Sequence, residues 1–383
     1  MKSDPFSQFI SAKGNSCCFL YDGQTGKNIL AFEAIETFTG SSIENFTKFT
    51  EKNSKNLLIG YISYDIAYYL YDIKQTAKDD LKLPKIYFHA YKKWQESKVE
   101  KDEIKFKKSK HNSTNFKPEI SKKKYSSAYN KIKNYIKEGD IYQINLTHRL
   151  KAETDIPAKE LFLRTIEKNP VEFAAYIEGK NFEILSASPE RFIKIENENI
   201  ETSPIKGTRP RGNTKTEDMK MKKELLESEK ESAELNMITD LLRNDLGKVC
   251  KIGTVRVVDH RVIKKCPTVW HTFSRITGKI ATTPLKALIS MLPGGSVTGC
   301  PKKRAIEIID ELEPTTRGIY TGVIGYIKPN NTMDFNIAIR TIIKKGKKLY
   351  LQVGGGIVID SNSGDEYKET LDKAKSFMKI LKK

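Results

Sequence analysis

The segment Ser203-Pro204-Ile205-Lys206-Gly207-Thr208-Arg209-Pro210-Arg211-Gly212 carries proline and glycine too closely spaced for a helix. Pro204 fixes its own φ and pushes the residue before it toward extended geometry. Gly207 lets the backbone approach a ligand closely, and Pro210 stiffens the exit. The segment therefore holds Lys206 in place, with an amine for chemistry and guanidinium groups nearby for an anion. An exposed basic turn is the alternative for this segment taken alone.

The composition is that of a folded protein. The 383 residues can bury a sizeable core, either as one large domain or as two ordinary ones. Hydrophobic residues make up 38% of the chain and aromatic residues 9%, which is enough for such a core. No apolar segment follows Met1 and no run is long enough to span a membrane, so we expect a soluble, cytoplasmic protein with no membrane partner. The five cysteines show no zinc-type spacing, which favours reduced thiols.

The formal net charge of +19 raises the question of a nucleic-acid partner. Lysines are spread along the whole chain, and only the segment from Lys101 to Lys124 is locally dense. That segment lacks the fold signature of a nucleic-acid-binding module. A solvated basic surface therefore explains the charge better, and we expect no nucleic acid among the partners. A basic nucleic-acid-binding protein is the alternative from another class of function.

Alternating patterns predict strands in two parts of the chain. Residues 56–63 and 85–91 are typical of an antiparallel sheet, and the Lys-, Asn- and Ser-rich segment 100–124 predicts a surface connection. After a predicted helix at 121–138, residues 140–147 form a strand with one polar face, which carries Gln143, Asn145 and Thr147. That face could line a site, although an ordinary half-exposed strand gives the same pattern.

A hairpin is predicted just before the lysine segment, with its turn within residues 195–200. Its two strands would bring the carboxylate of Glu190 close to the amine of Lys206. The carboxylate could accept the proton of the amine, or the two groups could form only an ion pair.

Two predicted helices each carry a pair of glutamates one turn apart. The first opens with the capping-box sequence Ser228-Glu-Lys-Glu231 and carries Glu231 and Glu234, while the C-terminal helix carries Glu366 and Glu369. Two such pairs could hold a hard cation such as Mg²⁺ through oxygen ligands. Solvated helix faces are the alternative for either pair taken alone.

Two glycine-rich segments offer backbone amides to an anion. Residues 292–302 run through Gly294 and Gly295 into a predicted helix, but the Gly-Lys-Ser/Thr order of a Walker A loop is absent. Residues 354–356, a run of three glycines that we place between two strands, are the second such segment. His271 by itself is more often a structural histidine than an acid catalyst.

Five motifs taken together resemble the chorismate-utilising enzymes, in order and spacing as well as in sequence. The motifs are Ser188-Pro-Glu-Arg-Phe192, Pro204-Ile-Lys-Gly-Thr-Arg-Pro-Arg-Gly212, Ala233-Glu-Leu-Asn-Met-Ile-Thr-Asp-Leu-Leu-Arg-Asn-Asp245, Pro293-Gly-Gly-Ser-Val-Thr-Gly-Cys-Pro-Lys302 and Gly354-Gly-Gly-Ile-Val358. The resemblance covers about residues 125–381. It implies an α+β fold of two large antiparallel β-sheets packed as a sandwich with helices on the outside. Strands of residues 1–118 then belong to the same sandwich, and residues 119–383 form the chorismate-binding catalytic region.

The resemblance also implies a set of site residues. Positions that match the catalytic residues of the family are Lys206, Glu190 and His271. Positions that match groups holding the substrate are Thr208, Ser296, Tyr320, Arg340, Gly354, Gly355, Gly356 and Lys373. Glu234 and Glu369 match the Mg²⁺ ligands, and Glu231 and Glu366 match the acidic residues one turn before each.

Within the family, Lys206 stands where anthranilate synthases carry alanine and resembles the branch that aminates chorismate at C4. The implied product is 4-amino-4-deoxychorismate, a precursor of 4-aminobenzoate and folate, and the implied nucleophile is Lys206. Gln143 stands where water-adding members have a lysine base, which argues against isochorismate as a product. The sequence shows no glutaminase constellation, so we expect ammonia from a glutamine amidotransferase subunit. Anthranilate formation, as component I of an anthranilate synthase, is the alternative within the family.

Overall fold

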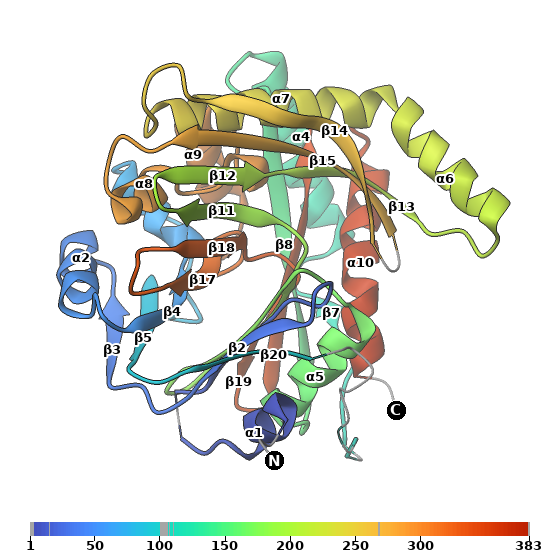
Figure 1. Ribbon diagram of the computed structural model, residues 1–383. Helices are drawn as coiled ribbons and strands as arrows, with labels where there is room; N and C mark the ends of the chain where they lie inside the picture. Colours follow the sequence, from blue (N-terminus) through green and yellow to red (C-terminus); the bar gives the residue numbers. More distant parts are fainter. Residues whose placement is uncertain are drawn as a thin grey trace.

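The structure is a computed structural model that describes residues 4–14, 16–99, 106, 108–109, 111–266 and 269–381. The strands in these residues form two large antiparallel sheets, with helices on their outer sides (Figure 1). This arrangement is the α+β sandwich that the sequence predicts. The predicted surface connection begins in residues 100–110, most of which lie outside the described residues.

The first sheet contains β8 and β20, the long strands that later prove to line the site. In pairing order its strands are β16 (Gly299–Cys300), β8 (Gln143–Glu153), β20 (Lys348–Ile357), β19 (Thr341–Lys345), β10 (Glu183–Ser188), β9 (Phe173–Glu178), β1 (Cys18–Tyr21), β2 (Lys27–Ala31) and β6 (Gln95–Lys98), with β7 (Lys117–Pro118) beside β8.

The second sheet contains the lysine segment, which forms its edge strand β13. In pairing order its strands are β13 (Ile205–Pro210), β15 (Val269–Lys279), β12 (Asn199–Ser203), β11 (Arg191–Glu196), β18 (Met333–Ile337), β17 (Val323–Ile327), β4 (Leu57–Ile62), β5 (Ile86–Tyr91) and β3 (Glu36–Gly40), with β14 (Arg256–Lys265) beside β15.

Strands from the N-terminal residues form one end of each sheet. In the first sheet β1 pairs with β9, and in the second sheet β4 pairs with β17. Every residue of β4 and β5 is buried, because the two strands have packed neighbours on both faces. Their sequences are accordingly richer in apolar residues than the simple alternation that we predicted.

Helices cover the outer faces of the sandwich. They are α1 (Pro5–Ser11), α2 (Ile43–Lys52), α3 (Ala67–Leu70), α4 (Lys122–Lys137), α5 (Ala158–Lys168), α6 (Lys215–Glu227), α7 (Glu229–Gly247), α8 (Pro284–Ser290), α9 (Lys302–Leu312) and α10 (Ser363–Ile380). Apolar side chains of α1, α5 and α10 pack on the first sheet, and those of α2, α7 and α8 pack on the second. A further cluster joins the two sheets directly, through residues such as Cys18 and Ile184 on one side and Ile59 and Ile324 on the other.

The structure corrects several details around the predicted site. Ser228 caps α7 by accepting a hydrogen bond from the amide of Glu231, but the Glu231 carboxylate pairs with Arg209 and does not complete a capping box. The three glycines of residues 354–356 lie within the continuous strand β20, where we had placed a break between two strands. Helix α6 was not predicted at all, although the reciprocal capping box of Thr214 and Glu217 opens it.

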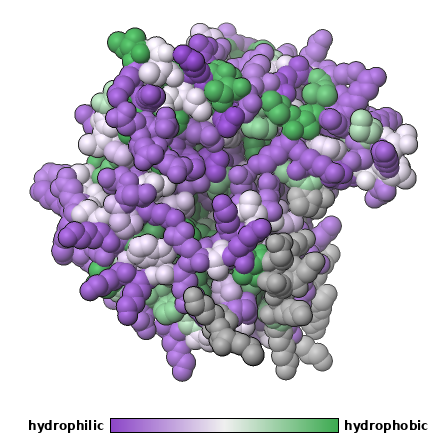
Figure 2. Space-filling view, in the orientation of Figure 1, coloured by the Kyte–Doolittle hydropathy of each residue, from purple (hydrophilic) through white to green (hydrophobic). Residues whose placement is uncertain are grey.

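Polar side chains cover most of the face shown in Figure 2, and apolar groups gather there only in small patches. Over the part of the chain that the structure describes, no helix has both the length and the apolar character needed to cross a membrane. All five cysteines carry free thiols, as the sequence predicts.

Candidate active site

A cavity of about 570 Å³, which we call the lysine cavity, is lined by strands of both sheets and by α7 and α10. Every site residue predicted from the sequence lines it, although they come from distant parts of the chain. These residues are Glu190, Lys206, Thr208, Glu231, Glu234, His271, Ser296, Tyr320, Arg340, Gly354, Gly355, Gly356, Glu366, Glu369 and Lys373. The fold thus brings them together, while the role of each stays a prediction.

Lys206 lies at an irregularity of β13, where the register with β15 shifts between Lys206 and Thr208. Gly207 makes this possible with a φ of 82°, and a Cβ there would lie 2.9 Å from Oε2 of Glu231. The Nζ atom of Lys206 donates to the carbonyl oxygen of Ser296 at 3.4 Å. No carboxylate among the described residues forms an ion pair with Lys206, so its amine faces the cavity with one long hydrogen bond.

Glu190 lies next to this amine and is only 6% exposed. Its Oε1 accepts a hydrogen bond from the hydroxyl of Ser296 at 2.9 Å. Burial raises the pKa of Glu190, and the nearby charge of Lys206 only partly opposes this. A buried carboxyl with a raised pKa can exchange a proton nearer neutral pH than an exposed one, which suits acid–base work beside an amine.

His271 lies on β15 opposite Thr208, and its Nδ1 is 2.8 Å from the Thr208 hydroxyl. Burial lowers the pKa of His271 to about 4, and the charge of Arg340 adds to the effect. The imidazole is therefore neutral at pH 7. It can donate a hydrogen bond from one ring nitrogen, but it does not carry the charge of an imidazolium acid.

Donors to an anion line another wall of the lysine cavity. Arg340 has a φ of 52° and forms no ion pair with any described residue, and burial lowers the pKa of its guanidinium. β19 pairs with β20 only as far as Leu351, so the edge of β20 at residues 354–356 has no β19 backbone opposite it. Lys373 donates to the carbonyl oxygen of Gly354 at 2.9 Å. The wall therefore combines two cations with an unpaired strand edge.

The four glutamates face the cavity from two helices but differ in their surroundings. Oε2 of Glu231 is buried and has no hydrogen-bond partner in the described residues. Glu366 is buried, which raises its pKa, and accepts a hydrogen bond from the hydroxyl of Ser361. Glu369 is half exposed and pairs with Lys373 at 2.8 Å; burial would raise its pKa, but Lys373 outweighs burial and lowers it. Glu366 is thus not on a solvated face.

No described group of three or more His, Cys, Asp or Glu side chains is close enough to hold a metal ion by itself. The chemistry of the donors nevertheless suits a hard cation, because carboxylates from α7 and α10 face one cavity and one buried carboxylate oxygen is unpaired.

Sequence reasoning missed Lys230, Gln352 and Asp372, which also line the lysine cavity. It had a signal for Asn145, which belongs to the predicted polar face of β8, and for Arg209, whose guanidinium was expected near an anion and pairs with Glu231. Gln143, on the same face, is 3% exposed and is not among the lining residues. Strand alternation identified this face but could not say which of its side chains reaches the cavity.

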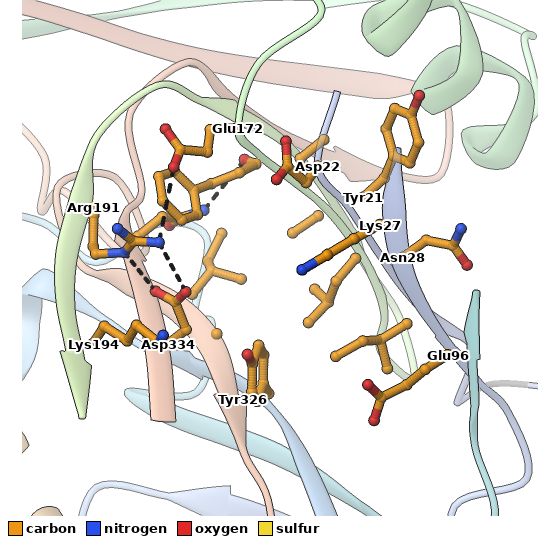
Figure 3. Close-up of a pocket in the computed structure, with 18 of the residues that line it drawn as sticks. Tyr21, Asp22, Lys27, Asn28, Glu96, Glu172, Arg191, Lys194, Tyr326 and Asp334 are labelled. Carbon is orange, nitrogen blue, oxygen red and sulfur yellow. Dashed lines mark hydrogen bonds and ion pairs between the residues drawn. The ribbon is translucent and has the colours of Figure 1, made fainter. Parts of the chain in front are cut away.

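A second cavity of about 690 Å³, which we call the inter-sheet cavity, is lined by β1, β2, β6 and β9 of the first sheet and by β11, β17 and β18 of the second. Figure 3 shows Arg191 and Asp334 joined across one wall, with Nε to Oδ1 at 3.0 Å. Arg191 also pairs with Glu201, and Lys328 pairs with Glu96. None of the predicted site residues lines this cavity.

A family model described as chorismate binding enzyme matches residues 15–379. The chain belongs to this family. Aminodeoxychorismate synthase component 1 of Bacillus subtilis (strain 168) is 36% identical over 385 aligned positions, which cover 91% of this chain and 80% of the relative. Anthranilate synthase component 1 of Acetivibrio thermocellus is 44% identical over 264 residues, 68% of this chain and 53% of the relative.

The crystal structure of anthranilate synthase component I from Streptococcus pneumoniae TIGR4 has a TM-score of 0.81 at 26% identity, over 98% of this chain and 97% of that one. The fold predicted from the sequence is therefore confirmed. The match to the Acetivibrio relative spans about half of that protein, whereas the match to the Bacillus relative spans most of it.

Proposed function

We propose that this chain converts chorismate and ammonia to 4-amino-4-deoxychorismate, with Lys206 as a covalent nucleophile. The observation that carries the proposal is the Lys206 amine, which faces the lysine cavity beside a buried carboxyl and without a described ion-pair partner. The name of the Bacillus relative, aminodeoxychorismate synthase component 1, supports the same reaction.

The covalent step begins with the neutral Lys206 amine. Its nitrogen forms a bond to C2 of chorismate, the ring double bonds shift, and the C4–O bond breaks, so that the C4 hydroxyl leaves as water after gaining a proton. Ammonia then forms a bond to C4, the double bonds shift back, and the C2–N bond to Lys206 breaks. The balance is chorismate plus ammonia to 4-amino-4-deoxychorismate plus water.

Proton transfer in these steps falls to groups beside Lys206. A lysine amine must lose a proton before it can attack, and Glu190 is the acceptor that the geometry supplies, because both side chains bond to Ser296. The neutral His271 can direct a hydrogen bond at the departing hydroxyl but does not deliver a proton as an imidazolium. Glu190, once protonated, is the better candidate to return the proton to the leaving oxygen.

Binding of the substrate rests on charge. Chorismate is a dianion, and Arg340, Lys373 and the edge of β20 at Gly354–Gly356 offer donors to its carboxylates. Because no described carboxylate forms an ion pair with Arg340, binding of the substrate would not first have to break one.

Mg²⁺ fits the carboxylates of α7 and α10, and we assign Glu234 and Glu369 as its protein ligands, with Glu231 and Glu366 beside them. When bound, the cation would neutralise a substrate carboxylate and fix the position of the ring.

A glutamine amidotransferase subunit is the proposed source of ammonia. The relatives are named as component 1 of their enzymes, which supports a second component here. Free ammonium at alkaline pH, where more of it is present as NH₃, should replace that subunit in the test tube.

Anthranilate synthesis is the second candidate, because anthranilate synthases match the chain at 40–44% identity over about two thirds of its length. One experiment separates the two reactions. The purified chain is incubated with chorismate, Mg²⁺ and ammonium, and the product is identified by mass spectrometry with and without an added aminodeoxychorismate lyase. Anthranilate as the main product would refute the proposal, and so would glutamine-dependent activity of the single chain.

A further inference from the structure

Asn145 lies near the start of β8, opposite Gly356 of β20, and lines the lysine cavity. Its backbone is fixed on both sides. The amide donates to the carbonyl oxygen of Thr298 at 2.9 Å, and the carbonyl oxygen accepts from Nη2 of Arg317 at 2.6 Å. Arg317 also bonds the carbonyl oxygen of Val297, so β8 and the loop that carries Ser296 are tied together.

The side-chain oxygen of Asn145 has no hydrogen-bond partner in the described residues. Its Oδ1 is buried and accepts no hydrogen bond. A Cβ on Gly354 would lie 2.8 Å from this Oδ1, so the absence of a side chain at Gly354 gives the amide its room. A buried amide oxygen without a donor costs about 1–3 kcal/mol, and in the lining of a cavity that collects donors for a ligand, a donor on that ligand is a physical reason to keep it.

The chemistry of the cavity indicates what that partner is. Arg340, Lys373 and the backbone edge of β20 are donors, which suit carboxylates. The acceptors Glu190, Glu231 and Glu366 are carboxyl groups, which when ionised repel a dianionic substrate. An amide oxygen accepts a hydrogen bond without adding charge. Of the two amide side chains in the lining, Gln352 already donates to Thr147, whereas Asn145 is unpaired.

We propose that the Asn145 side chain is a substrate-contacting specificity residue, whose amide oxygen accepts a hydrogen bond from a neutral donor on one of the two reactants. The donor is either the C4 hydroxyl of chorismate or an N–H of the incoming ammonia. The inference rests on the proposed function for the identity of these reactants. Because an amide oxygen only accepts hydrogen bonds, Asn145 would favour a reactant with a hydroxyl or an amine at this point over one whose group there can only accept.

The test compares Asn145→Ala and Asn145→Asp with the parent protein and with Asn336→Ala. Asn336 is a matched control, because its Oδ1 is also buried without a described partner, but in the inter-sheet cavity. The affinity for chorismate is measured by calorimetry with Mg²⁺ and without ammonium. The KM for ammonium is measured at saturating chorismate, and the Tm of every variant is recorded.

Loss of one hydrogen bond to a neutral donor should cost about tenfold in one of the two constants. If the ring hydroxyl is the donor, Asn145→Ala weakens chorismate binding about tenfold and leaves the KM for ammonium unchanged; if ammonia is the donor, the pattern is reversed. Asn145→Asp should weaken chorismate binding because of charge repulsion, and the deficit relative to the parent should shrink as the pH falls and the new carboxyl is protonated.

Asn336→Ala should change neither constant. If both Asn145 variants bind chorismate and use ammonium within twofold of the parent, the inference is wrong. Asn145→Asp has nearly the shape of the parent, so the inference stays falsifiable even if Asn145→Ala does not fold: chorismate binding by Asn145→Asp within twofold of the parent at neutral pH would by itself exclude a substrate contact at this side chain. The binding measurement does not depend on the product, so a parent that binds chorismate but forms anthranilate would refute the proposed function and leave the test of Asn145 intact.

Discussion

The two cavities of the sandwich are similar in size and both are rich in charged side chains, yet they differ in how those charges are paired. In the inter-sheet cavity, Arg191 contacts the carboxylates of Asp334 and Glu201, and Lys328 contacts Glu96. In the lysine cavity, neither Lys206 nor Arg340 forms an ion pair with a described residue. The paired charges of the inter-sheet cavity satisfy one another, whereas the unpaired cations of the lysine cavity are available to a ligand.

This difference separates the two cavities more clearly than size does, because the Lys206 amine and the Arg340 guanidinium of the lysine cavity have no ion-pair partner among the described residues. A buried charge without a partner costs free energy of folding, and a protein retains it where a substrate provides the partner. The comparison predicts that substitutions in the lysine cavity change catalysis, and that matched substitutions in the inter-sheet cavity change stability.

The largest effect is expected for Lys206→Ala. Loss of the nucleophile should lower formation of 4-amino-4-deoxychorismate by about 10⁴-fold. Because Lys206 then no longer occupies C2 of chorismate, ammonia can add there, and the residual turnover should shift toward the 2-amino product. Mass spectrometry of the intact protein after a chorismate quench should show an adduct on the parent and none on the variant. Lys194→Ala, in the lining of the inter-sheet cavity, serves as the control and should keep parent activity. Parent rates in Lys206→Ala would make Lys206 a binding residue.

The carboxylates of α7 and α10 come next. Either Glu234→Gln or Glu369→Gln should lower Mg²⁺-dependent turnover by about 1000-fold, because each removes a charged oxygen ligand. Their Tm should stay close to that of the parent. The control Glu96→Gln alters an exposed carboxylate at the inter-sheet cavity and should leave turnover within twofold. Full activity of Glu369→Gln over a Mg²⁺ titration would remove this residue from the metal site.

The two arginines give the sharpest contrast. Arg191→Ala leaves Asp334 and Glu201 without their partner, so it should lower the free energy of unfolding by about 3 kcal/mol. Arg340→Gln removes an unpaired cation, so stability should be equal or higher, while the KM for chorismate should rise about 100-fold. Urea denaturation and steady-state kinetics of both variants measure the two effects. A stability loss in Arg340→Gln as large as in Arg191→Ala would erase the distinction between the cavities.

The smallest effect concerns pH. Burial lowers the pKa of both His271 and His148 to about 4, against about 6.5 in the unfolded chain. Between these values the unfolded state binds more protons, so stability should fall as the pH falls from about 6.5 to 4, by about 1 kcal/mol per histidine at pH 5.5. No histidine is among the residues that line the inter-sheet cavity. The plot of Tm against pH should be flatter for His148→Gln than for the parent. An unchanged slope would contradict the lowered pKa assigned to His148.

The sandwich and the members of the lysine cavity were predicted through the resemblance of five continuous motifs to the chorismate-utilising enzymes, which implied both the fold and the matching site positions. Prediction from the sequence failed where pairing in space decides the structure. The glycines of residues 354–356 resemble a loop, since they have no side-chain pattern, and only their pairing with β8 makes them a strand. Most side chains of helix α6 are exposed and only Leu225 is buried, so no apolar periodicity marked it.

The inter-sheet cavity could not be predicted for a similar reason. Its charged groups are single residues on separate strands, such as Arg191 on β11 and Asp334 on β18, and only sheet register brings them together. Asn145 was visible as part of a polar strand face, but which member of that face reaches the cavity depends on the twist and packing of β8 against β20.

The pairing of N-terminal strands with later strands in both sheets has a consequence for biosynthesis. β4 leaves the ribosome early, but its partner β17 is made only near the end of the chain. Leu58 of β4, for example, has no pairing partner until Ile327 of β17 has been synthesised. Until then β4 exposes a strand edge made of apolar residues, which is the kind of surface that aggregates or recruits chaperones. Contacts of such long sequence separation also slow folding. A nascent chain that stalls before β17 therefore cannot complete either sheet, and proteolysis of such fragments should be rapid.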